Sequence, residues 1–190
     1  ATIALIGGAD ITANFRPGTM AISIGMLLSA LAMTWHLVHF HYVKFNKKSM
    51  YEISKKIILL CIPLLLSAQF IAGILNEALD LTDTNQELFI SMSHNIFGVL
   101  SIAIVPILEE FLFRGAIEGH LLRKGWSPKW AILVSALIFG IIHGNPAQIP
   151  FAFLIGLLFG WLYYRTGSLV PGIVGHIINN SFGAWTMFTA

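Results

Sequence analysis

Residues 104–115 of the chain read Ile-Val-Pro-Ile-Leu-Glu-Glu-Phe-Leu-Phe-Arg-Gly, and this stretch constrains the fold more than any other. Two adjacent carboxylates, Glu109 and Glu110, and the guanidinium of Arg114 interrupt a run that is otherwise apolar enough to lie in a membrane. On insertion scales, each charge at the centre of a bilayer costs about 2.5–3.5 kcal/mol. Such charges are tolerated where they face protein or a water-filled cavity, so we expect this helix to lie inside a bundle.

The composition of the chain indicates a membrane protein. Of its 190 residues, 56% are hydrophobic and only 11% are charged, whereas a soluble globular domain carries about 25% charged residues. The formal net charge is +2 and the basic residues are confined to segments between apolar runs, so we expect no nucleic-acid partner. The sequence predicts an all-α, multi-pass transmembrane helical bundle, with residues 1–190 forming a single domain.

Six apolar segments approach or exceed the roughly 20 residues that a membrane-spanning helix needs. The fourth and fifth are short and are separated by Gly144-Asn145-Pro146, which indicates helices that end inside the protein. Residues 1–16 are irregular, and we expect an interfacial or re-entrant piece there, or the remnant of a further span. The six predicted spans are residues 19–43, 57–75, 95–122, 128–143, 149–164 and 169–188.

The start of the third span requires a break in the helix. A helix from residue 88 to residue 122 would be about 50 Å long at 1.5 Å per residue, too long for one crossing. We therefore expect its first residues to lie along the outer surface, or Pro106 to kink it.

The distribution of charge between the spans predicts their orientation. Residues 44–56 contain five lysines and one glutamate, which favours a cytoplasmic position, whereas residues 76–87 contain acidic residues and no basic ones. Further cytoplasmic loops are indicated by Arg123, Lys124, Lys129 and Arg165. We expect a multi-pass protein of the cell membrane, specifically the plasma membrane of a prokaryote, with the lysine-rich loops in the cytoplasm.

Polar side chains on three predicted spans fall at similar depths in the membrane. Glu109 and His143 each lie 14 residues from a basic residue of a cytoplasmic loop, or about 21 Å at 1.5 Å per residue. His176 and Asn180 share one helix face because they are four residues apart. We expect these four side chains to meet in one buried polar site, since ionisable groups inside a membrane are functional candidates by default.

The three charges of the opening stretch have different expected roles. Glu110 and Arg114 are four residues apart on a helix and can form an ion pair. Glu109 points about 100° away from Glu110, toward other helices. We predict that Glu110 and Arg114 orient the site while Glu109 does the chemistry; a purely structural pair is the open alternative.

Three motifs in the second half of the chain resemble those of a known family. Residues 109–114 fit the motif EExxxR, residues 139–143 fit FxxxH, and residues 176–180 fit HxxxN. The chain is similar to the CPBP family (CAAX protease and bacteriocin-processing, or Abi) of intramembrane glutamic endopeptidases, and in its motifs to the Ras-converting CAAX endoprotease. The motifs occur in order within residues 95–190, which we expect to be the catalytic core.

The resemblance implies peptide hydrolysis without a metal, another cofactor or a covalent intermediate. Glu109 and His143 would polarise the water that attacks the scissile carbonyl, and His176 and Asn180 would donate hydrogen bonds to the oxyanion. The implied partners are membrane lipid and a membrane-associated peptide or protein, such as a CAAX C-terminus or a bacteriocin or pheromone precursor.

Two alternatives to this interpretation stay open. The first is a zinc-dependent protease in which Glu109, His143 and His176 bind the metal; activity that resists EDTA, without stoichiometric zinc, would exclude it. The second is a protein that cleaves nothing, either an ion or proton pathway or an immunity protein that binds a peptide. A transporter should show two related halves with broken spans, and the sequence has no such repeat. Function retained by Glu109→Ala would favour peptide binding.

Overall fold

The computed structural model describes residues 17–43 and 55–189, and within them every regular element is helical. The predicted N-terminal segment 1–16 and most of the lysine-rich segment 44–56 lie outside the described residues. The elements are α1 (Pro17–His39), α3 (Lys55–Ala78), α4 (Gln86–Ser93), α5 (Ile96–Glu110), the π-helix η1 (Phe111–Glu118), α6 (Gly119–Arg123), α7 (Pro128–Ile142), α8 (Ile149–Thr166) and α9 (Val170–Thr189).

The predicted all-α transmembrane bundle is confirmed, and each of the six predicted segments contains a helix. Four stretches of the described chain are long and apolar enough to cross a membrane, and α7 is a shorter apolar helix. The four are Gly18–His39, Cys61–Ala78, Ile96–Arg123 and Ile149–Thr166.

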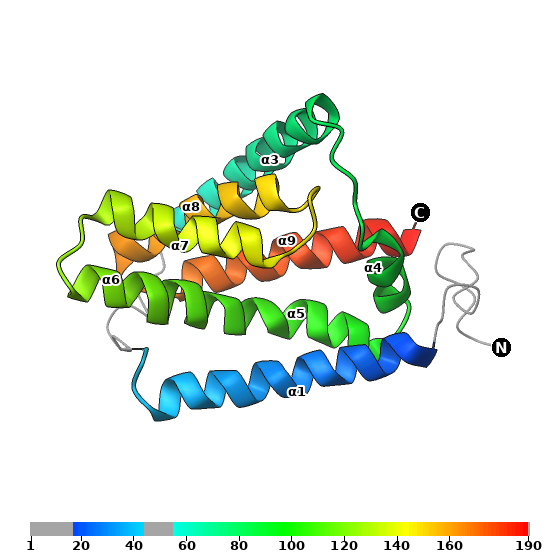
Figure 1. Cartoon of the computed structure of the whole chain (residues 1–190), viewed down its shortest axis with the longest axis horizontal. Coiled ribbons are helices and arrows are strands. Elements are labelled where there is room, and N and C mark those ends of the chain that lie inside the picture. Colours follow the sequence, from blue (N-terminus) through cyan, green and yellow to red (C-terminus); the bar gives the residue numbers. More distant parts are fainter. Residues whose placement is uncertain (1–16, 44–54, 190) are drawn as a thin grey trace.

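The helix that carries the charged stretch lies in the middle of the bundle. α5 packs against α1 on one side and α9 on the other, and α7 and α8 form a hairpin that packs against η1, the continuation of α5 (Figure 1). A Cβ atom on Gly156 of α8 would lie 3.0 Å from the Cβ atom of Ala136 of α7, so only small residues let these two helices approach so closely. α3 packs against α8 and α9, and the short α4 packs near the start of α5 (Figure 1).

The expected break at the start of the third span is present, and it falls at residues 94–95. α4 ends at Ser93, and Asn95 caps α5 by accepting a hydrogen bond of 2.7 Å from the backbone N–H of Gly98 through its side-chain oxygen. Pro106 lies inside α5, and the helix continues through it. The break leaves Ile96–Arg123 as a stretch that is long and apolar enough to cross a membrane.

The π-helix is a feature that the sequence analysis did not predict. Residues Phe111–Glu118 leave the α-helical pattern just after the two glutamates. The hydroxyl of Ser135, on α7, donates a hydrogen bond of 2.9 Å to the backbone carbonyl of Phe113 within this segment. A side chain that inserts into the backbone ladder in this way distorts a helix, and π-helical turns are frequent at functional sites.

Candidate active site

The predicted ion pair between Glu110 and Arg114 is confirmed. Arg114 Nη1 lies 3.0 Å from Glu110 Oε1, and both side chains are almost completely buried. The same carboxylate oxygen lies 3.1 Å from Nδ1 of His176, which comes from α9. Glu110 therefore joins the charged stretch to the helix that carries the third motif.

His176 lies between the two glutamates. Its Nε2 is 3.4 Å from Oε2 of Glu109, while its Nδ1 is bonded to Glu110. The Glu109 side chain is 22% exposed and that of Glu110 is 0% exposed, so the neighbours occupy different environments, as the 100° offset predicts.

The Arg114 guanidinium is held by more than its ion pair. Its Cζ atom lies 4.5 Å from the ring centroid of Phe139 and 5.5 Å from that of Phe159. Its Nη2 donates a hydrogen bond of 3.3 Å to the backbone carbonyl of Gly156 on α8. Desolvated cation–π contacts of this kind are worth about 2 kcal/mol, so the charge is stabilised by α7 and α8 as well as by Glu110.

Phe139 organises the site, although the sequence analysis gave it no separate role. Besides facing the arginine, its ring meets the rings of His143 and His176 edge-on, with centroids 4.9 and 5.7 Å away. Phe139 is fully buried and is the first residue of the FxxxH motif. The sequence signal for this role of Phe139 is the four-residue spacing, which places Phe139 and His143 on one helix face.

Two glycines make room for buried carboxylates. A Cβ atom on Gly172 of α9 would lie 2.6 Å from Glu110 Oε2, and one on Gly160 of α8 would lie 2.6 Å from Glu118 Oε2. Glu118 is fully buried, and neither of its oxygens has a hydrogen-bond partner among the described residues. Gly160 and Gly172 therefore let the two buried carboxylates pack closely against α8 and α9. The sequence analysis did not predict this role for Gly172.

His143 follows α7, and the direction of its ring is set by one hydrogen bond. Nδ1 lies 2.7 Å from the backbone carbonyl of Phe139. A carbonyl can only accept, so Nδ1 carries the proton and Nε2 of the neutral ring is an acceptor. His143 thus has the tautomer that a base acting through Nε2 requires.

One cavity of about 320 Å³ brings together the side chains of Glu109, His143, His176 and Asn180. Asn180 Oδ1 accepts a hydrogen bond of 3.2 Å from Asn179 Nδ2, which leaves the amide N–H groups of Asn180 as donors. All four side chains that the sequence analysis selected line this cavity, and their membership of an active site and their chemical roles stay predictions.

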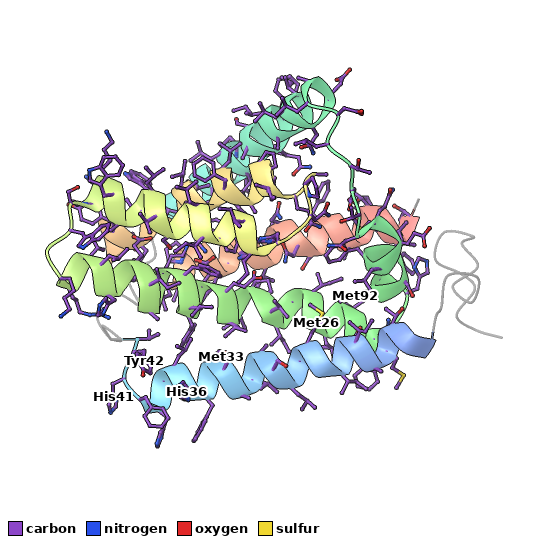
Figure 2. The ribbon with its side chains drawn as sticks, viewed as in Figure 1. Met26, Met33, His36, His41, Tyr42 and Met92 are labelled. Atoms are coloured by element: carbon purple, nitrogen blue, oxygen red, sulfur yellow. The ribbon has the colours of Figure 1, made fainter. Side chains whose placement is uncertain are left out.

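The rest of the cavity wall is largely apolar and comes from several helices. Met26 of α1 and Met92 of α4 line it, and Figure 2 shows both of them well away from His41 and Tyr42. Other apolar lining residues are Phe89, Ile102, Val105, Phe151, Ile155 and Met187. Such a wall suits an apolar or amphipathic chain more than a small polar solute.

Within residues 17–43 and 55–189, no three His, Cys, Asp or Glu side chains are grouped as a metal site would require. Glu109 and Glu110 both approach His176, but the three side chains are not arranged as the ligands of a metal ion. Zinc binding stays an open alternative, and the sensitivity of activity to EDTA is its test.

Comparison with known proteins relates the same part of the chain to membrane peptidases. Residues 91–182, which contain all three motifs, match the family model described as type II CAAX prenyl endopeptidase Rce1-like. No solved structure matches the chain.

Three curated relatives cover about half of this chain. The putative membrane peptidase YdiL of Bacillus subtilis is 36% identical over 84 residues, which are 44% of this chain and 34% of the relative. The membrane-embedded CAAX protease MroQ of Staphylococcus aureus is 33% identical over 105 residues, 53% of this chain and 42% of the relative. The probable CAAX prenyl protease 2 of Schizosaccharomyces pombe is 30% identical over 114 residues, 50% of this chain and 42% of the relative. The chain thus matches less than half the length of each of these relatives.

Proposed function

The chain belongs to the CAAX prenyl endopeptidase (CPBP) family through residues 91–182, and from this premise we propose that it is a glutamate-dependent intramembrane endopeptidase. The reaction is hydrolysis of a peptide bond in a membrane-associated peptide or protein. One observation carries the proposal: Glu109, His143, His176 and Asn180, from three separate helical segments, line a single cavity between apolar helices.

In the proposed reaction a water molecule lies between Glu109 and His143. Glu109 takes its proton, Nε2 of His143 accepts its second hydrogen bond, and the oxygen forms a bond to the scissile carbonyl carbon. General-base assistance of this kind contributes about 10²–10⁴-fold to the rate. The proton then moves from Glu109 to the leaving nitrogen as the C–N bond breaks, which yields a carboxylic acid and an amine.

The developing oxyanion is proposed to lie beside His176 and Asn180. The Asn180 amide can present its N–H groups to the cavity, because its oxygen accepts the hydrogen bond from Asn179. We assign the second oxyanion contact to Nε2 of His176, because its Nδ1 already lies 3.1 Å from Glu110 Oε1. The Glu110–Arg114 pair acts by holding His176 in this position.

The proposed substrates are peptides with an apolar or lipid-modified segment beside the scissile bond. MroQ and the S. pombe relative are named as CAAX proteases, and a CAAX-type C-terminus would bring such a segment to the apolar wall of the cavity. We place the protein in the cell membrane, with its lysine-rich loops in the cytoplasm as the charge distribution predicts.

The function is tested by comparing membrane peptides from cells that express the active chain with those from cells that express Glu109→Gln. New peptide termini should appear in the membrane fraction of the first culture and be absent from the second. Identical sets of termini in the two cultures would argue against an endopeptidase and in favour of a peptide-binding protein.

The oxyanion role predicts a specific kinetic change in Asn180→Ala. The loss of one donor should lower kcat by about 10²–10³-fold, with KM changed by less than about threefold, because the contact forms mainly in the transition state. Steady-state cleavage of a substrate peptide in proteoliposomes measures both constants. Ser181→Ala, at the exposed neighbouring position, serves as the control with unchanged kinetics. A higher KM with unchanged kcat would instead assign Asn180 to substrate binding.

A further inference from the structure

Asn145 is the fully buried residue of the turn between α7 and α8, and its side chain and backbone carbonyl are both hydrogen-bonded. Its Nδ2 donates to Asp83 Oδ1 at 2.7 Å, and its Oδ1 accepts from the backbone N–H of Thr84 at 3.2 Å. Its backbone carbonyl accepts from the N–H groups of Gln148 and Ile149 at 2.9 and 3.2 Å. The side chain thus binds a distant segment while the backbone closes the turn.

The segment bound by Asn145 is the connection between α3 and α4. Asp83 Oδ1 also accepts a hydrogen bond of 2.9 Å from the backbone N–H of Asn85, which fixes the carboxylate within its own loop. A separate bond of 2.9 Å runs from Asn76 Nδ2, near the end of α3, to the carbonyl of Ala147 in the turn. The turn and the connection are therefore joined at more than one point.

Both of these segments contribute to the cavity wall. The turn starts with His143 and ends with Gln148, and the connection ends with Asn85; all three residues line the cavity. Asp83 and Asn76 lie outside residues 91–182, so one side of this junction comes from a part of the chain that the family model does not match.

We propose that Asp83 and Asn145 are positioning residues that hold His143 at the cavity, an inference that rests on the proposed peptidase function. The residue after His143 is Gly144, with φ of +60°, a conformation that glycine adopts without strain and that leaves the backbone free to turn. The Asn145 side chain supplies the missing restraint by fixing the turn to Asp83 and Thr84. A catalytic group displaced by about 1 Å can lose about 10²-fold in rate.

The first test uses Asp83→Ala in the full chain and does not depend on activity. Hydrogen exchange of the backbone amides of residues 144–149, followed by mass spectrometry in lipid nanodiscs, should accelerate at least about tenfold as the turn loosens. Asp80→Asn, which removes an exposed carboxylate from the same connection, is the control and should leave the exchange unchanged. Unaltered exchange of the turn in Asp83→Ala would overturn the proposal.

The second test measures cleavage, at a temperature well below thermal unfolding of each variant. Asp83→Ala should lower kcat about 10- to 100-fold per folded molecule with KM changed by less than about threefold. A purely structural role would lower the folded fraction and leave kcat per folded molecule unaltered, and that result would reject the positioning role.

A third test swaps the residues at positions 83 and 145 and asks whether the swap rescues kcat. Asn145→Asp alone places two carboxylates against each other and should lose at least as much kcat as Asp83→Ala. Asp83→Asn combined with Asn145→Asp restores a donor–acceptor pair and should return kcat to within about threefold of the original chain. Failure of the double variant to exceed Asn145→Asp would contradict the assignment. If the original chain itself cleaves nothing, the peptidase proposal fails. The hydrogen-exchange measurement on Asp83→Ala still decides whether the junction holds the turn.

Discussion

We expect Glu109→Gln to lower the single-turnover rate of peptide cleavage at least about 10³-fold below that of the original chain, while the protein still inserts and folds. The amide keeps the shape of the side chain but cannot take a proton from water, which removes the general base. Folding should be retained because Glu109 is 22% exposed, and the tightly buried ion pair involves Glu110 instead. The rate is measured in proteoliposomes on a peptide identified from membrane fractions.

The matched control for this variant is Glu77→Gln, which removes an exposed carboxylate near the end of α3. It should cleave at the original rate, and both variants should unfold at temperatures close to that of the original chain. Normal cleavage by Glu109→Gln would show that another group is the base.

Arg114→Ala should lower both stability and rate. Removal of one partner from a buried ion pair leaves the other charge uncompensated, which costs about 3–5 kcal/mol. The variant also loses the guanidinium contacts with Phe139 and Phe159. Cleavage should fall as well, because Glu110 then loses the charge that holds it beside His176. Thermal unfolding in detergent and single-turnover cleavage measure the two effects.

The control for this variant is Arg165→Ala, which removes an exposed arginine near the end of α8. Exposed charges contribute about 0–1 kcal/mol, so its stability and rate should stay near those of the original chain. A stability of Arg114→Ala equal to that of Arg165→Ala would mean that the buried pair is not required for folding.

The helices could be predicted from the sequence because membrane insertion leaves few options for an apolar segment. Each apolar segment must satisfy its backbone N–H and C=O groups by hydrogen bonds within a helix, so each apolar run predicts a helix. The Glu110–Arg114 contact follows from spacing on a helix for a similar reason. Both features depend on local sequence.

Other features depend on contacts between residues that are far apart in the chain. The π-helix accompanies the hydrogen bond from Ser135 to Phe113, a partner 22 positions away. The burial of Asn145 against Asp83 joins two connecting segments that local sequence does not relate. Gly172 appears in the sequence as an ordinary small residue, and its meaning emerges only when Glu110 Oε2 lies against it.

Matched depth led us to expect Glu109, His143, His176 and Asn180 close together, and all four line one cavity. The geometry within that cavity could not be predicted. The position of His176 between both glutamates could not be inferred, because it depends on how α9 is rotated against α5. A single helix pattern restricts which face is polar, and packing against neighbours decides which pairs touch.

The central claim is that Glu109 and His143 act together on one water molecule, and a double-mutant cycle tests it most directly. Single-turnover cleavage is measured for the original chain, Glu109→Gln, His143→Ala and the double variant, all confirmed as folded. Residues that act as a unit are strongly non-additive, so the double variant should be no more than about threefold slower than the slower single variant. If the two losses multiply instead, Glu109 and His143 act independently, and the shared-water mechanism is wrong.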